Sequence, residues 1–228
     1  MTKGKPLKLI FLFALPLMLG NILQQLYTMV DTMIVGQFLG VNALASLGAA
    51  DWINWAILGI VMGFTQGFSI RISRTFGAED YGNMKRSMHM IFFLCAFFSI
   101  LTTVVEELSI VPLLTLLNTP SNVIQGSITY LRIMSGGLTI TMFYNCFSSI
   151  LRSLGDSRTP LLAMIGGAIT NICLDLLFVV VFKWGIAGAA IATLLAQFLT
   201  TIFCLYMLKK ELPFKLELTK FKLIFHIF

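Results

Sequence analysis

The sequence has few charged residues. Only 11% of its 228 residues are charged, against about 25% in an ordinary soluble domain, while 57% are hydrophobic and the mean hydropathy is +0.90. This composition excludes a soluble globular enzyme. Several uncharged apolar stretches are long enough to cross a bilayer core, which takes about 20 helical residues. We therefore predict an all-α membrane protein whose partner is the lipid bilayer.

The sequence also lacks the usual motifs of enzymes and metal sites. Its four cysteines lie in apolar stretches, without CxxC spacing and without nearby His or acidic ligands, which indicates buried side chains. It has no nucleophile-and-base constellation and no phosphate-binding glycine loop, so we expect neither an enzyme nor a cofactor. The net charge is +6, but the basic residues flank apolar spans, so we read them as markers of membrane topology. We expect no nucleic-acid partner.

Six transmembrane spans are expected within residues 1–210, forming one six-helix bundle. The first is a retained helix rather than a signal peptide, because its apolar run continues to Leu39 without a small-residue cleavage site. Residues 211–228 are expected to form a cytoplasmic linker and the beginning of an incomplete seventh helix. The six spans cover residues 7–39, 50–70, 87–105, 123–151, 160–182 and 185–208.

The positions of the basic residues predict the orientation of these spans. If the N-terminus is cytoplasmic, only Lys183 and Arg132 of the 16 basic residues fall outside cytoplasmic segments. The positive-inside rule therefore places both ends of the six-helix unit in the cytoplasm. We expect the protein to lie in the cell inner membrane.

Two aspartates fall inside predicted spans, where a carboxylate is costly without a partner, a proton or water. Asp31 and Asp175 each precede the outer end of a span by about eight residues, or about 12 Å at 1.5 Å per residue. Thr193 and Tyr130 lie at a similar depth in two further spans. Four helices therefore offer polar groups at one level of the membrane.

Further polar residues share helix faces with these aspartates. Asn171 precedes Asp175 by four residues, and Tyr27 has the same relation to Asp31. Carboxylate, amide and hydroxyl oxygens suit either a monovalent cation such as Na⁺ or a proton shared between carboxyl groups. The alternative is that each aspartate makes only a structural hydrogen bond to a neighbouring helix.

Other polar residues have less distinctive positions. Gln24 and Asn145 lie deep enough to line a cavity, although a hydrogen bond between helices explains them equally well. Asp51, Glu106 and Glu107 lie close to predicted outer ends, where we expect ordinary solvation.

Five segments carry a resemblance to a known family. They are PLMLGNILQQLYTMVDTMIVGQFLG at 16–40, GAEDYGNMKRS at 77–87, LRSLGDSRTPL at 151–161, TNICLDLLF at 170–178 and WGIAGAAIATLLAQ at 184–197. In this order and spacing the sequence resembles the MATE (multidrug and toxic compound extrusion) family over nearly its whole length. The resemblance implies one lobe of a twelve-helix transporter that exchanges H⁺ or Na⁺ for organic, often cationic, drugs.

The resemblance also implies a location for the coupling ion. It places the ion site at Asp31, Asn171, Asp175 and Thr193, with Tyr130 and Asn145 as further cavity positions. The second six-helix half is expected to be supplied by another chain or by a second copy.

Two alternatives remain open at this stage. The first is a lipid-linked oligosaccharide flippase of the same superfamily, which needs basic residues in its cavity; Arg132 is the candidate inside a span. The second is a truncated fragment that does not transport.

Overall fold

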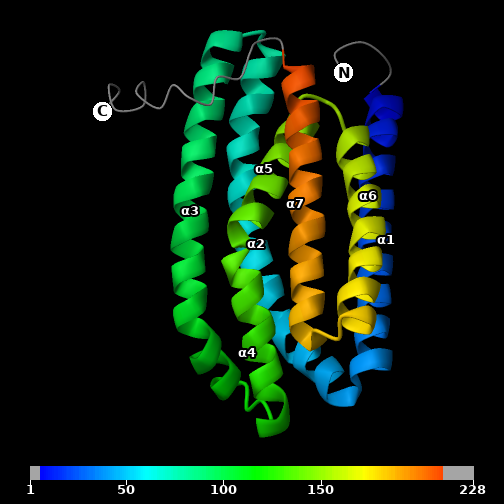
Figure 1. Cartoon of the computed structure of the whole chain (residues 1–228). Coiled ribbons are helices and arrows are strands. Elements are labelled where there is room, and N and C mark those ends of the chain that lie inside the picture. Colours follow the sequence, from blue (N-terminus) through cyan, green and yellow to red (C-terminus); the bar gives the residue numbers. More distant parts are fainter. Residues whose placement is uncertain (1–5, 213–228) are drawn as a thin grey trace.

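The structure is a computed structural model that describes residues 6–212. These residues form helices packed side by side into one elongated bundle (Figure 1). Turns near Gly40, Asn118 and Lys183 lie at one end, called here the Gly40 end. Turns near Asp80 and Gly155 lie at the opposite end, called here the Gly155 end. The prediction of an all-α membrane fold is confirmed for the described residues.

The first three helices are long. They are α1 (Pro6–Leu39), α2 (Val41–Gly77) and α3 (Tyr81–Leu116). With 37 residues, α2 extends about 55 Å, well beyond the roughly 30 Å of a bilayer core. The helices are longer than the expected spans 50–70 and 87–105. They continue through mostly apolar residues at 41–49 and 108–116, and through polar residues at 71–77 and 81–86.

The expected single span at 123–151 is two helices in the structure. Both α4 (Ser121–Gly136) and α5 (Leu138–Ser153) have 16 residues, and they meet at Gly137. A Cβ atom at Gly137 would collide with the side chain of Leu194. The missing side chain at Gly137 therefore lets α7 approach the junction of α4 and α5. The contact is with Leu194, a residue far from Gly137 in the sequence.

The last part of the bundle contains a local change of helix type. The helix α6 (Arg158–Asp175) continues into the π-helical segment η1 (Leu176–Val181), and α7 (Gly185–Glu211) follows. Within the described part, α2, α3, α7 and α6 together with η1 are long and apolar enough to cross a membrane. Residues 213–228, which include most of the predicted linker and seventh helix, lie outside the described residues.

The buried apolar side chains form two clusters along the length of the bundle. One joins α2, α3, α5 and α7 toward the Gly155 end and includes Met84, Met142 and Leu208. The other lies toward the Gly40 end, where α1 also contributes, and includes Val35 and Leu131. The candidate site lies beside these clusters, so packed helices hold its walls in place.

Candidate functional site

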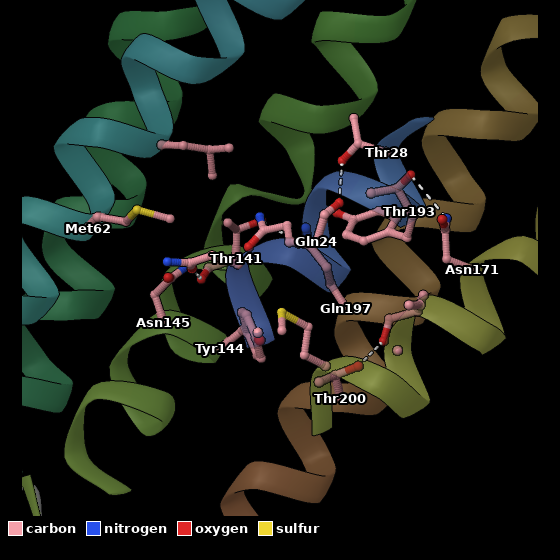
Figure 2. Close-up of a pocket in the computed structure, with 18 of the residues that line it drawn as sticks. Gln24, Thr28, Met62, Thr141, Tyr144, Asn145, Asn171, Thr193, Gln197 and Thr200 are labelled. Atoms are coloured by element: carbon pink, nitrogen blue, oxygen red, sulfur yellow. Dashed lines mark hydrogen bonds between the residues drawn. The ribbon is translucent and has the colours of Figure 1, made fainter. Parts of the chain in front are cut away.

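A partly open cavity of about 470 Å³ lies among the helices of the bundle and receives side chains from all seven α-helices. Its lining residues extend from Leu47 and Asp51, toward the Gly40 end, to Arg152 and Ser157 at the Gly155 end. Figure 2 shows polar side chains of α1, α5 and α7 around this interior space. The cavity therefore offers polar groups over much of the depth of the bundle.

The structure brings the predicted site residues together at this cavity. Asp31 is 9% exposed, and Asp175 is fully buried next to it, where the two carboxyl groups interact. The predicted residues that line the cavity are Gln24, Tyr27, Asp31, Tyr130, Asn145, Asn171 and Thr193. Asp175 is not one of the lining residues and lies buried beside Asp31.

Two tyrosines lie close to the aspartate pair. Tyr27 of α1 and Tyr130 of α4 both have electrostatic interactions with Asp31 and Asp175. Tyr130 is 6% exposed and packs within the apolar cluster at the Gly40 end. Residues from α1, α4 and α6 thus meet at one place, as the counting of residues along each span predicted.

Asn171 connects the aspartates to α7. Its Nδ2 donates a hydrogen bond to Thr193 Oγ1 at 3.3 Å (Figure 2). Thr193 Oγ1 in turn donates to the carbonyl of Ala189 at 3.1 Å. Because the amide nitrogen faces Thr193, the Asn171 side chain keeps its Oδ1 free as an acceptor. This oxygen has no hydrogen-bond partner within residues 6–212.

The most informative feature of the site is its unpaired oxygen atoms. Asp31 Oδ1, Asn171 Oδ1 and both carboxyl oxygens of Asp175 are buried without a hydrogen-bond donor in the described part of the chain. A buried acceptor without a partner costs about 1–3 kcal/mol, and more when it is charged. Such a cluster can be stabilised by a proton on a carboxyl group or by a small cation among the oxygens.

The backbone around Asp175 also departs from regular α-helix. The segment η1 begins directly after this residue, and the Phe178 carbonyl accepts a hydrogen bond from Trp184 N at 2.9 Å. The rings of Phe178 and Trp184 stack with centroids 4.8 Å apart. Short π-helical segments occur often at functional sites, because they rotate side chains out of α-helical register.

The other predicted cavity residues take different roles. Asn145 Nδ2 donates to the carbonyl of Thr141 at 2.9 Å, one turn earlier in its own helix. The Thr141 hydroxyl donates to Gln197 Oε1 at 2.6 Å, which joins α5 to α7 beside the cavity. Thr28 donates to the backbone carbonyl of Gln24 at 2.9 Å, as Figure 2 also shows.

The expectation that Glu106 is solvated was wrong. Glu106 is only 2% exposed and lines the cavity, because α3 continues to Leu116 instead of ending near Val105. The apolar residues that follow Glu107 were the signal in the sequence for this continuation. Asp51 also lines the cavity and is half-buried rather than freely solvated.

The two arginines have different relations to the cavity. Arg132 lies outside the cavity lining, and its exposed side chain faces Glu107 with 3.7 Å between Nε and Oε2. Arg152, assigned from the sequence to a cytoplasmic segment, lines the Gly155 end of the cavity and donates to Ser148 Oγ at 3.0 Å. Charge along the cavity is therefore acidic toward the Gly40 end and basic at the Gly155 end.

A protein-family model and curated relatives both match this chain, and they point to the same family. The MatE family model matches residues 16–177. The chain is 34% identical to the "Probable multidrug resistance protein YpnP" of Bacillus subtilis over 94% of its length and 49% of that protein. It is 28% identical to the "Probable multidrug resistance protein NorM" of Thermotoga maritima over 90% of its length and 45% of that protein.

Solved structures give the same picture. A crystal structure titled MATE in the bent conformation superposes with a TM-score of 0.87 at 30% identity, over 96% of this chain and 49% of that one. A MOP superfamily transporter from Pyrococcus furiosus, described as having a binding pocket of reverse polarity, superposes with a TM-score of 0.86 at 29% identity. The match covers 95% of this chain and 48% of that one. The chain spans about half the length of these relatives.

Proposed function

The chain belongs to the MatE family, and from this membership we propose that it forms the N-terminal half of an ion-coupled antiporter. The transporter exports organic cations across the cytoplasmic membrane, and its coupling ion is H⁺ or Na⁺. The observation that supports the proposal most directly is the group of buried, unpaired oxygens on Asp31, Asn171 and Asp175.

In this proposal the coupling ion occupies the oxygen cluster in one conformation of the bundle. A proton on the Asp31–Asp175 pair removes the repulsion between two carboxylates, whereas Na⁺ is held by the two carboxyl groups and the oxygens of Asn171 and Thr193. Either ion favours the conformation in which these groups are drawn together. Differential affinity of this kind lets an ion gradient drive a change between two conformations.

The charge of the cavity favours a cationic substrate. Asp31, Asp51 and Glu106 line it, and Arg152 is the basic residue among its described lining residues. A flippase for phosphate-linked lipids needs basic groups around the phosphate. Arg132, the residue on which that alternative depended, is outside the cavity lining and pairs with Glu107.

The partner in this proposal is a second six-helix bundle. The relatives are about twice as long as this chain, so a second half or a second copy completes the cavity between two bundles. The whole transporter then holds one ion site of this kind in the half described here.

The test measures flux and ion binding separately. The chain is reconstituted in liposomes, alone and together with a six-helix partner half, and uptake of ethidium is followed under an imposed H⁺ or Na⁺ gradient. We expect Asp175→Asn to abolish gradient-driven uptake, because the amide can neither bind a proton nor carry a charge. Glu107→Gln, an equivalent change at an exposed carboxyl group, is the control and should leave uptake unchanged.

Binding of the ion is measured on the purified chain by calorimetric titration with Na⁺ and by pH titration in its absence. Heat from Na⁺ binding that disappears in Asp175→Asn identifies Na⁺ as the coupling ion, whereas a lost protonation step identifies H⁺. Normal flux and normal ion binding in folded Asp175→Asn would refute the proposed site.

A further inference from the structure

Glu106 is a second buried carboxyl group in the cavity, on a helix that the aspartate pair does not use. It lies on α3, is 2% exposed and lines the cavity, and its Oε2 has no hydrogen-bond partner within residues 6–212. The next residue, Glu107, points elsewhere, with 39% exposure and Arg132 at 3.7 Å. Two adjacent glutamates thus occupy opposite environments, and only one of them reaches the interior.

The helices packed against α3 bring no cation to Glu106. From α4, the Ser135 hydroxyl adjoins the carboxyl group, while Arg132 is engaged with Glu107. From α2, the charged group at the cavity is Asp51, which has the same sign as Glu106. From α5, the charged or titratable side chains at the cavity are Tyr144 and Arg152, and Arg152 lies at the far Gly155 end.

A buried carboxylate without a cation nearby is strongly destabilised in a membrane-spanning bundle. A metal cation would need several oxygen ligands. Around Glu106 the described structure offers the hydroxyl of Ser135, whose Oγ has no hydrogen-bond partner of its own, and Thr103 donates to the Ser135 carbonyl at 3.3 Å. A proton, which needs a single oxygen, is the ligand that fits this place.

We propose that Glu106 is a proton-binding site of the cavity, separate from the Asp31–Asp175 pair. The proton is carried on the carboxyl group beside Ser135 and is released to the water of the cavity. Glu106 thereby lets the cavity change its net charge without any change at Asp31 or Asp175. The inference extends the proposed transport function, although the binding of the proton itself does not require transport.

The test is infrared difference spectroscopy of the purified chain during a pH titration, because a protonated carboxyl group has a carbonyl stretch that its carboxylate lacks. We expect Glu106→Gln to remove one titrating carboxyl band. Glu107→Gln, the matched control one residue away, should keep this band, and Asp175→Asn should keep it as well. Identical titrating spectra for Glu106→Gln and the wild-type chain would overturn the proposal.

Two further measurements make the assignment specific. Glu106→Asp keeps a carboxyl group on a shorter stem, so the band should remain but move in frequency; an unmoved band belongs to another residue and refutes the assignment, even if Glu106→Gln fails to fold. Repeating the titration in saturating Na⁺ should leave the band in place, whereas its loss to Na⁺ would overturn the choice of a proton.

The outcomes also separate this inference from the proposed function. If Asp175→Asn leaves ion-coupled flux and ion binding unchanged while Glu106→Gln still loses its band, the coupling site is refuted and the Glu106 site stands. If Asp175→Asn loses ion-coupled flux and ion binding while Glu106→Gln keeps the titrating band, the Glu106 site is refuted and the coupling site stands.

Discussion

Replacing Gly126 with alanine tests how closely α4 packs against α2. An ideal Cβ at Gly126 would lie 2.8 Å from Ser46 Cβ and 2.8 Å from Ile186 Cδ1, and it would also meet Ser46 Oγ. Ser46 Oγ donates to the carbonyl of Val123 at 2.9 Å, and Ser127 Oγ donates to the carbonyl of Ser46 at 2.8 Å. The added methyl group therefore collides with Ser46, a residue that hydrogen-bonds α2 to α4.

The expected loss of stability follows from three contributions. Overpacking costs about 1–3 kcal/mol, because the Ser46 Cβ cannot move without its backbone. Loss of the two interhelical hydrogen bonds costs about 0.6 kcal/mol each in a membrane protein. The better helix propensity of alanine recovers about 1 kcal/mol, which offsets the lost hydrogen bonds only. The net expectation is a loss of about 1–3 kcal/mol in the free energy of unfolding.

The assay is SDS-induced unfolding of the purified chain in mixed micelles, followed by circular dichroism. Gly136→Ala is the matched control, since it lies in the same helix and has nothing within 4 Å of an added Cβ. It should be neutral or slightly stabilising. If the two alanine variants unfold at the same SDS concentration, the close approach of α2 and α4 at Gly126 is refuted.

Two more predictions concern the end of the bundle and the ion site. Asp80 accepts a hydrogen bond from Asn83 N at the start of α3, which holds the pKa of Asp80 below its usual range. Asp80→Ala should therefore lower the thermal unfolding midpoint at neutral pH, and the difference from wild type should vanish as the pH falls through the lowered pKa; a constant difference would contradict this. Thr193→Val removes the hydroxyl oxygen that accepts the hydrogen bond from Asn171 Nδ2. The concentration of coupling ion needed for half-maximal flux should therefore rise about tenfold or more. Thr201→Val, whose hydroxyl bonds only within its own helix, is the control and should change nothing.

The relative positions of the candidate site residues were predictable because helices have a fixed rise per residue. Counting residues from the ends of apolar spans placed Asp31, Asp175, Tyr130 and Thr193 at one depth, and the structure brings them to one region of the bundle. The spacing of four residues put Asn171 on the face of Asp175, where it also reaches Thr193.

The positions that sequence reasoning placed wrongly depend on contacts between helices. Glu106 and Glu107 are adjacent in an apolar helix, and nothing local indicates which of them turns inward. That choice is made by the packing of α3 against α4, which gives Arg132 to Glu107 and leaves Glu106 inside. At Gly137, where α4 and α5 meet, the side chain of Leu194 from α7 fills the space that a Cβ atom would occupy.

Three aspartates of this chain have their carboxyl groups in different surroundings. Asp80 accepts hydrogen bonds from Asn83 at the start of α3, and Asp156 Oδ1 accepts the backbone N–H groups of Arg158 and Thr159 at the start of α6. In each case Oδ1 accepts backbone N–H groups at the start of a helix, whereas Asp156 Oδ2 is buried without a partner among the described residues.

Asp175 is more deeply buried than either of these residues, yet no donor in the described part of the chain reaches its oxygens. A carboxyl group that only joined helices would need a donor from a neighbouring helix. On the same helix as Asp175, Asn171 turns its amide nitrogen to Thr193. The described residues therefore do not offset the free-energy cost of removing the Asp175 carboxyl group from water. In the proposed function, a proton or Na⁺ at Asp175 supplies the positive charge that the described residues do not, and the transport cycle depends on its binding and release.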